Sequence, residues 1–289
     1  MDDALRGAVA SAVGAEIVAA APVHGGDVAI AYRVDLDDGR RVFTKMHRSP
    51  PAAFFTTESA GLTWLRDAGA LPVPGVLAVS DGDAGTPAHL VLEWVDRGSP
   101  GPGTEADLGR GLAALHRAGA LCFGREDRRT TGSRGLPNEP CDTWPEFYAA
   151  NRLLPLARLA ADAHALPDGA VADLERLAGR LDTFGAADEG PARLHGDLWA
   201  GNRLVDQGGR SWLIDPAAHG GHREFDLAMM RLFGGFGADC FDAYEEAHPL
   251  ADGWAERVPL HQIAPLVVHA IKFGGSYGPA AVDAIRRCS

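Results

Sequence analysis

The residues Leu194-His195-Gly196-Asp197-Leu198-Trp199-Ala200-Gly201-Asn202 carry most of the information about the fold, together with Trp212-Leu213-Ile214-Asp215-Pro216 after them. Residues 203–205 and 211–214 have strand character and flank Gln207-Gly208-Gly209, which is a turn signal. A short hairpin therefore joins the two stretches. One Asp and one Asn are placed on a tight loop, and a second Asp follows the hairpin.

An ordered set of two carboxylates and one amide is what phosphoryl transfer from ATP to a hydroxyl requires. One carboxylate receives or orients the proton of the attacking hydroxyl, while an amide oxygen and the second carboxylate hold Mg²⁺ on the phosphates. We therefore expect Asp197 to act as the base, and Asn202 and Asp215 to hold Mg²⁺. Each of the three alone is better explained as a turn residue, but their order and spacing favour the catalytic interpretation.

The first part of the chain supplies the other half of such a site. Gly25 and Gly26 open a predicted hairpin over 24–47, where their backbone N–H groups can cover phosphates. Lys45 lies in the second strand and is one of only two lysines among 27 basic residues, which favours a place that needs a compact ammonium. Glu58, on the next helix, is expected to pair with Lys45. The peptide groups of Glu93, Trp94 and Val95 are expected to bond the adenine edge.

The pattern of apolar residues predicts an α+β fold with two lobes. Residues 1–96 are expected to form a small, strand-rich N-terminal lobe, and residues 97–289 a larger, mainly helical C-terminal lobe. Strands are expected at 28–34, 40–47, 75–80 and 89–95, and helices at 1–20, 52–68, 104–118, 144–161, 168–183, 223–234, 238–247 and 258–272. A cleft between two lobes is a natural ligand site.

Composition narrows the classes of partner. The chain has 289 residues and is 46% hydrophobic and 23% charged, which is typical of a globular protein. Its net charge of −12 disfavours nucleic acid and anionic membranes as partners. The N-terminus lacks the features of a signal peptide, so we expect a cytoplasmic protein. Four widely spaced cysteines predict neither a zinc site nor a disulfide framework. A monomer is expected.

The two opening stretches resemble the catalytic and metal loops of the protein-kinase-like and aminoglycoside-phosphotransferase-like superfamily, and most closely those of the fructosamine kinase (ketosamine-3-kinase) family. The run from Ile214-Asp215-Pro216-Ala217 through Gly221-His222-Arg223-Glu224-Phe225-Asp226-Leu227-Ala228-Met229 is similar to that family as well. Further similar segments are Glu58-Ser59-Ala60-Gly61-Leu62, Leu232-Phe233-Gly234-Gly235-Phe236, Tyr244-Glu245-Glu246-Ala247 and Gly275-Ser276-Tyr277-Gly278. The resemblance covers nearly the whole chain.

This resemblance implies a protein-kinase-like fold and ATP-dependent phosphorylation of O3 of a ketosamine, such as a ribulosamine, erythrulosamine or fructosamine, in deglycation. It implies that His195 and Asp226 support the catalytic loop, with Asp226 accepting backbone N–H bonds. Trp199 is expected either to line the sugar pocket or to be a core residue. Protein kinases carry Arg at the position of Gly196, so we expect no switch by activation-loop phosphorylation.

Two other functions stay open. The first is phosphorylation of an aminoglycoside or of a choline-like or homoserine-like alcohol by the same fold, and an aminoglycoside would require a densely acidic pocket. The second is a non-catalytic ATP-binding scaffold, against which the joint presence of Lys45, Asp197, Asn202 and Asp215 argues. The basic cluster within 125–134 is expected to be a solvated loop or a contact for an acidic substrate, and His219 and His222 are expected to lie in a loop rather than to bind metal.

Overall fold

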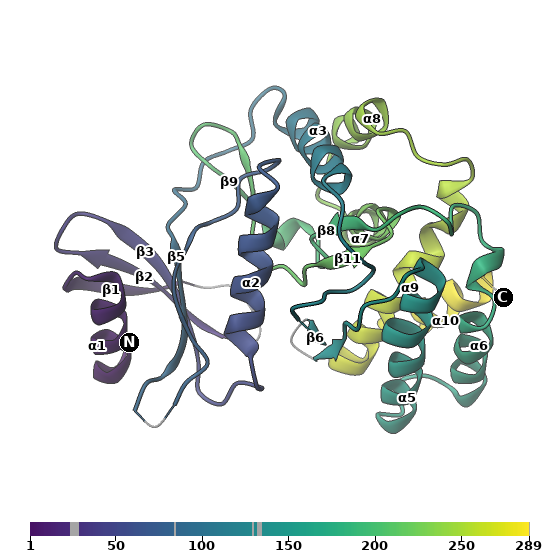
Figure 1. Cartoon of the computed structure of the whole chain (residues 1–289), viewed down its shortest axis with the longest axis horizontal. Helices are drawn as coiled ribbons and strands as arrows, with labels where there is room; N and C mark the ends of the chain where they lie inside the picture. The colour runs from purple at the N-terminus through teal and green to yellow at the C-terminus, as the bar shows by residue number, and fades with distance from the viewer. Residues whose placement is uncertain (24–28, 84, 129, 132–134, 289) are drawn as a thin grey trace.

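The computed structural model describes residues 1–23, 29–83, 85–128, 130–131 and 135–288 (Figure 1). The expected α+β fold is confirmed, because an antiparallel sheet of five strands is followed by a mainly helical part of the chain. Gly25 and Gly26, the expected glycine loop, lie outside the described residues.

The sheet has the strand order β1-β2-β3-β5-β4, and every neighbouring pair is antiparallel. Its strands are β1 (Ile17–Val23), β2 (Ile30–Leu36), β3 (Arg41–His47), β4 (Val76–Ser80) and β5 (Ala88–Glu93). The turn Asp37-Asp38-Gly39 joins β2 to β3 as expected, with Gly39 in the left-handed region at φ 84°. This sheet brings β3 beside β5 and so places the lysine strand next to the segment expected to bond adenine.

Alternation along β3 decides which of its side chains face the rest of the molecule. Val42 and Met46 pack in a cluster with Leu5 and Val9 of helix α1 (Asp3–Val13), which covers one face of the sheet. Phe43 packs instead with the cluster that includes the buried side chains of helix α2 (Phe54–Asp67). Lys45 is two residues from Phe43 and therefore points to the α2 face.

The expectation of one helix over residues 1–20 is wrong in its second half. Helix α1 ends at Gly14, which adopts φ 68° and donates its N–H to the carbonyl of Ala10. The chain then extends into β1, which pairs with β2 at the edge of the sheet. An alanine-rich segment such as Ile17–Val23 has a weak pattern of its own, so its strand state depends on pairing with β2 rather than on local preference.

The second part of the chain forms the helical body on the right of Figure 1. Its helices are α3 (Thr104–Arg117), α4 (Trp144–Tyr148), α5 (Leu154–Asp162), α6 (Asp168–Ala178), α7 (Glu224–Phe233), α8 (Ala238–Ala247), α9 (Trp254–Phe273) and α10 (Tyr277–Arg287). Short strands lie between them: β6 (Thr130–Thr131), β7 (Leu136–Pro137), β8 (Ala192–Leu194), β9 (Arg203–Val205), β10 (Ser211–Leu213) and β11 (His219–Gly221). A π-helical turn, Ala149–Leu153, joins α4 to α5.

Helix α10 and the pair β8–β11 were not expected from the sequence. Gly274 and Gly275 have φ of 65° and 60°, so they end α9 and turn the chain back. The small apolar face of α10, with Ala281 and Ile285 fully buried, then packs in the same core as α9. Among the described residues, no helix combines the length and the apolarity that crossing a membrane requires.

Candidate active site

The catalytic loop, residues 195–202, and the metal loop, residues 214–217, leave the ends of β8 and β10 and lie against each other. His195 connects them: its Nε2–H donates to the carbonyl of Ile214 at 2.9 Å, and its Nδ1 accepts the N–H of Asp197 at 3.2 Å. Burial lowers the pKa of His195, which keeps the ring neutral and matches this pattern of one donor and one acceptor nitrogen. His195 thus fixes the two loops relative to each other.

Asp226 of α7 holds the start of the catalytic loop. Its carboxylate accepts the backbone N–H groups of His195 at 2.8 Å and of Gly196 at 2.9 Å. His116 lies 3.3 Å from the same carboxylate and bonds Tyr244 through its other nitrogen. The carboxylate is fully buried, and these donors keep its pKa low although burial alone would raise it. Asp226 therefore fixes the backbone of His195 and Gly196.

Gly196 occupies a place that no other residue fits. Its φ is 79°, and a Cβ there would lie 2.2 Å from the carbonyl oxygen of Ala217. The close approach brings the catalytic loop against the metal loop. An arginine such as protein kinases carry at this position would require the two loops to separate.

Asp197 and Asn202 are bonded to each other within the catalytic loop. The Nδ2 amide of Asn202 donates to the Oδ2 of Asp197 at 3.1 Å and to its backbone carbonyl at 2.8 Å. Both bonds use the amide nitrogen, so the Oδ1 of Asn202 remains an acceptor for a cation. Burial raises the pKa of Asp197 to about 7, and the charges of Asp215 and Asp226 add to this shift.

Lys45 joins the sheet to helix α2 and to the metal loop. Its ammonium Nζ lies 2.8 Å from the Oε1 of Glu58 on α2 and 2.6 Å from the Oδ1 of Asp215 on the metal loop. Burial would lower the pKa of Lys45, but the two carboxylates outweigh it and raise that pKa above its usual range. Asp215 adopts the left-handed region at φ 55°, a conformation that non-glycine residues keep mainly where the surrounding structure imposes it.

Helix α2 is attached to the helical part of the chain through Trp64. Arg193 of β8 donates to the backbone carbonyl of Trp64 at 2.7 Å, and its guanidinium carbon lies 4.6 Å from the centroid of the indole ring. The guanidinium of Arg125 lies over the same ring at 4.5 Å. Gly61, one turn earlier, would bring a Cβ within 3.2 Å of Ala218. These contacts hold α2, and with it Glu58, close to the metal loop.

The interpretation of the basic cluster as a solvated loop is therefore wrong for Arg125. This side chain is buried, bonds both oxygens of Asp127 at 2.7 Å and covers Trp64. Arg128 donates to the carbonyl of Asp127, and Arg129 and Arg134 lie outside the described residues.

A cavity of about 610 Å³ opens between the sheet and the helical part of the chain. Lys45, Glu58, Asp197, Asn202 and Asp215 all line it, so the structure brings these five predicted residues together. The segment Glu93-Trp94-Val95 lines it as well. The N–H of Glu93 donates to the carbonyl of Gly75 at 2.8 Å, so this N–H is not available to an adenine edge.

Trp199 lines the same cavity and is 42% exposed, so it is not a core residue. Its ring centroid lies 6.3 Å from that of Phe233, and a Cβ on Gly201 would collide with its ring. Glycine at position 201 therefore makes room for the indole. Of the two expectations for Trp199, the structure favours a place on the wall of the cavity.

The charges around the cavity are mixed rather than acidic. Its described lining contains the carboxylates of Glu58, Glu93, Asp197 and Asp215 and the cations Lys45, Arg97, Arg152 and Lys272. Glu58 and Asp215 are already paired with Lys45, and Glu93 lies 3.3 Å from Arg66. Asp197 is thus the only lining carboxylate in the described part of the chain that makes no ion pair.

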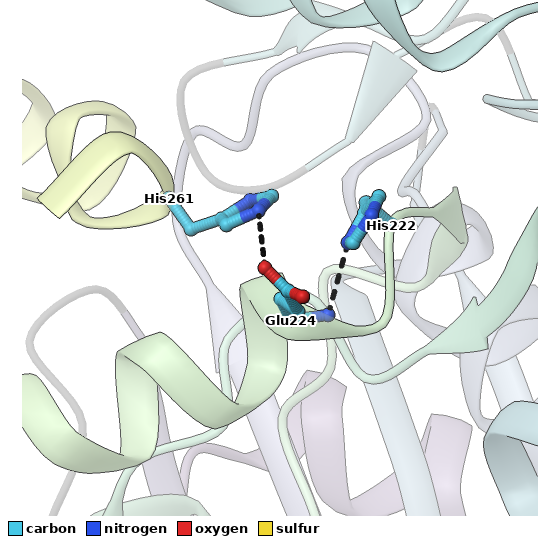
Figure 2. A group of neighbouring side chains, drawn as sticks. All are labelled: His222, Glu224 and His261. Atoms are coloured by element: carbon cyan, nitrogen blue, oxygen red, sulfur yellow. Dashed lines mark hydrogen bonds and ion pairs between the residues drawn. The ribbon is translucent and has the colours of Figure 1, made fainter. Parts of the chain in front are cut away.

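A second group of possible metal ligands lies away from the cavity. His222, Glu224 and His261 have ligand atoms within 4.8 Å of one another and are all buried (Figure 2). Both carboxylate oxygens of Glu224 are bonded by Arg257. His222 accepts the N–H of Glu224 through Nδ1 and donates to the carbonyl of Ala186 through Nε2. The carboxylate is neutralised and both nitrogens of His222 are engaged, so this cluster anchors the start of α7 instead of offering a cation site.

Sequence reasoning missed the contacts of Trp64, Arg193 and Arg152. The first two are joined across 129 residues, and no local pattern connects them. Arg152 belongs to a helix that reads as ordinary amphipathic sequence. For Lys272, which also lines the cavity, the sequence did offer a signal, because it is the second of only two lysines in the chain.

Known proteins are similar in sequence to this chain over nearly its full length. The family model described as Fructosamine kinase matches residues 2–289. The protein named Probable ketoamine kinase from Lactiplantibacillus plantarum is 36% identical over 267 residues, covering 91% of each chain. Mouse Ketosamine-3-kinase is 30% identical over 293 residues, covering 92% of this chain and 93% of its own.

Solved structures that are similar to this one point to the same family as the sequence relatives. A structure from Thermobifida fusca assigned as a fructosamine-3-kinase has a TM-score of 0.91 and 41% identity, and covers 100% of this chain and 99% of that one. The fold extends to an aminoglycoside phosphotransferase solved with ADP and hygromycin B, at a TM-score of 0.65 and 16% identity, covering 99% of this chain and 96% of that one. With a family model over 288 residues and relatives at 30% and 36% identity, the chain belongs to the fructosamine kinase family of ATP-dependent phosphotransferases.

Proposed function

We propose that this protein transfers the γ-phosphoryl group of ATP to the O3 hydroxyl of a small-molecule ketosamine. The observation that carries the proposal is the convergence of Lys45, Asp197, Asn202 and Asp215 on one cavity. Phosphoryl transfer depends mainly on positioning and on electrostatic stabilisation, and these four groups supply both. The 3-phosphate destabilises the sugar–amine adduct, so the reaction serves deglycation.

The donor set fits Mg²⁺. Asn202 offers an amide oxygen and Asp215 a carboxylate, which are the hard oxygen ligands that this ion takes while phosphate and water complete its shell. When bound, Mg²⁺ neutralises charge on the phosphates and orients them. Zinc is disfavoured, because neither cysteine nor histidine is part of this donor set.

The remaining residues act on the phosphates and on the acceptor. Lys45 holds the α- and β-phosphates with its ammonium, whose charge the neighbouring carboxylates stabilise. Asp197 accepts the proton of the attacking O3 hydroxyl. A pKa raised to about 7 suits this role, since a base whose pKa is near the working pH accepts the proton most effectively. In this proposal the carbonyl of Glu93 and the peptide of Val95 bond adenine, and Trp199 covers the sugar; all three residues line the cavity.

The lining of the cavity supports a ketosamine over an aminoglycoside. An aminoglycoside carries several positive charges and requires several unpaired carboxylates, whereas Asp197 is the only one among the described lining residues. A non-catalytic scaffold is disfavoured for a separate reason. Asp197 is half-buried, and its raised pKa reflects an energetic cost that a protein without a reaction to catalyse has no need to bear.

A substrate panel tests the proposal. The purified protein with Mg-ATP is offered a ribulosamine, an erythrulosamine, a fructosamine and kanamycin, and phosphate transfer is followed by mass spectrometry. We expect phosphorylation of at least one ketosamine at O3, with none on kanamycin. Phosphate on kanamycin alone, or on none of the four, would overturn the proposal.

A further inference from the structure

One buried arginine of the cavity has no carboxylate partner among the residues that the structure describes. Arg152 lies in the π-helical turn between α4 and α5, is 3% exposed, and lines the cavity. Its Nη1 donates to the carbonyls of Pro137 at 2.6 Å and Asn151 at 2.9 Å, and its Nη2 donates to the Oδ1 of Asn138 at 3.3 Å. All three acceptors are neutral. A guanidinium has five N–H groups, so two of them have no partner among the described residues.

The other buried arginines are different. Arg125, Arg223 and Arg257 each form an ion pair with a carboxylate, from Asp127, Glu189 and Glu224 respectively. In the described part of the chain, Arg152 is the only buried arginine without such a pair. Burial lowers the pKa of Arg152 to about 10; the phenol of Tyr148 opposes that shift, but no carboxylate does, and the side chain stays charged at neutral pH. A buried charge of this kind is costly unless something pairs with it.

Arg152 lies on the same side of the cavity as the catalytic and metal loops. Its guanidinium carbon is 4.6 Å from the ring centroid of Phe147, and the ring of Phe147 is 5.5 Å from that of His219. His219 in turn bonds the carbonyl of Ala217 in the metal loop at 2.8 Å. The cation therefore lies on the helical side of the cavity, near the metal loop, whereas Lys45 comes from the sheet side.

We infer that Arg152 binds a carboxylate on the amine part of the acceptor, so that the enzyme prefers ketosamines of free amino acids to those of uncharged amines. This inference rests on the proposed function, because it concerns the acceptor of that reaction. A carboxylate can take the two remaining N–H groups of the guanidinium and neutralise its charge, and the planar fork of arginine matches that geometry. The acceptor then enters with O3 toward Asp197 and its carboxylate toward Arg152.

The experiment compares acceptors that differ only in that charge. Ribulosyl adducts of glycine and of 4-aminobutyrate are each assayed beside the adduct of the corresponding amide, at saturating Mg-ATP. We expect the kcat/KM of at least one acid to exceed that of its amide by about 10- to 100-fold, which is the range for a hydrogen-bonded charge pair. In Arg152→Gln this ratio should fall to near one. The exposed Arg158, changed to Gln, removes the same charge from the surface of α5 and should leave the ratio unchanged.

The outcomes separate this inference from the proposed function. If no ketosamine is phosphorylated, the proposed function fails. If acids and amides are phosphorylated equally well by the wild-type protein, Arg152 is not a carboxylate site, and this result does not depend on whether the variant folds. If Arg152→Gln raises the KM for ATP and keeps the preference for acids, the guanidinium serves the nucleotide and the inference is overturned.

Discussion

The ammonium of Lys45 lies 2.6 Å from the carboxylate of Asp215, although 170 residues separate the two in the sequence. One residue comes from the sheet and the other from the metal loop, so this contact joins the two sides of the cavity. Glu58 contacts the same ammonium from α2. Three separate elements therefore meet where the phosphates of ATP are proposed to bind.

Replacing Lys45 by Met should damage nucleotide use. The substitution keeps the length of the side chain but removes the charge that contacts Glu58 and Asp215. We expect kcat/KM for ATP to fall by about 10²- to 10³-fold, the usual cost of losing one electrostatic contact to a transition state. Steady-state kinetics with varied ATP measure the effect. Kinetics for ATP that match the wild-type protein would remove Lys45 from the site.

Trp64 should control the position of Glu58 without touching ATP. In Trp64→Leu the cation–π contacts of Arg125 and Arg193 are lost, so α2 is held less firmly. We expect kcat/KM for ATP to fall by about 10-fold, with the KM for the acceptor unchanged. Thr63→Ala, at an exposed position of the same helix, is the control. A drop in thermal stability with unaltered kinetics would show that Trp64 has only a structural role.

His219 should make stability depend on pH. Burial lowers its pKa to about 3, below the value of 6.5 in the unfolded chain. The unfolded state therefore binds the proton more readily, and stability present above pH 6.5 is lost as the pH falls toward 3. Between pH 7.5 and 5.5 the loss of unfolding free energy from this one group is on the order of 1 kcal/mol.

Urea unfolding of the wild-type protein and of His219→Asn at these two pH values isolates that contribution. Asparagine keeps a donor near the Nδ1 position, which bonds Ala217, but does not titrate. The comparison is needed because the raised pKa of Asp197 acts in the opposite direction over the same range. Equal changes in unfolding free energy for the two proteins would show that His219 takes up its proton as readily in the folded state as in the unfolded chain, which contradicts the lowered pKa.

The sequence was enough to predict which residues meet at the cavity, but not the contacts that hold them there. Asp197, Asn202 and Asp215 lie within a short, ordered stretch, so residue type and spacing alone predict their convergence. The contact of Trp64 with Arg193 has no such signal, because it depends on how two distant elements pack. Likewise, the lack of a carboxylate partner for Arg152 among the described residues can be seen only when its surroundings are known.

The strand β1 illustrates a second limit. Ile17–Val23 follows a helix without a strong break other than Gly14, and its alanines favour a helix locally. Pairing with β2 overrides that preference, since six residue pairs join the two strands. Local preference therefore fails where an edge strand is specified by its neighbour.

The central claim is that Asp197 serves as the base of a phosphoryl transfer whose nucleotide is held by other residues. It is tested most directly by measuring ketosamine phosphorylation and ATP affinity together in Asp197→Asn, with mass spectrometry for the product and calorimetry for binding. We expect turnover to fall by about 10²- to 10⁴-fold, the range for a general base, while the Kd for Mg-ATP stays within about threefold of wild type. Turnover within tenfold of the wild-type rate would contradict the claim.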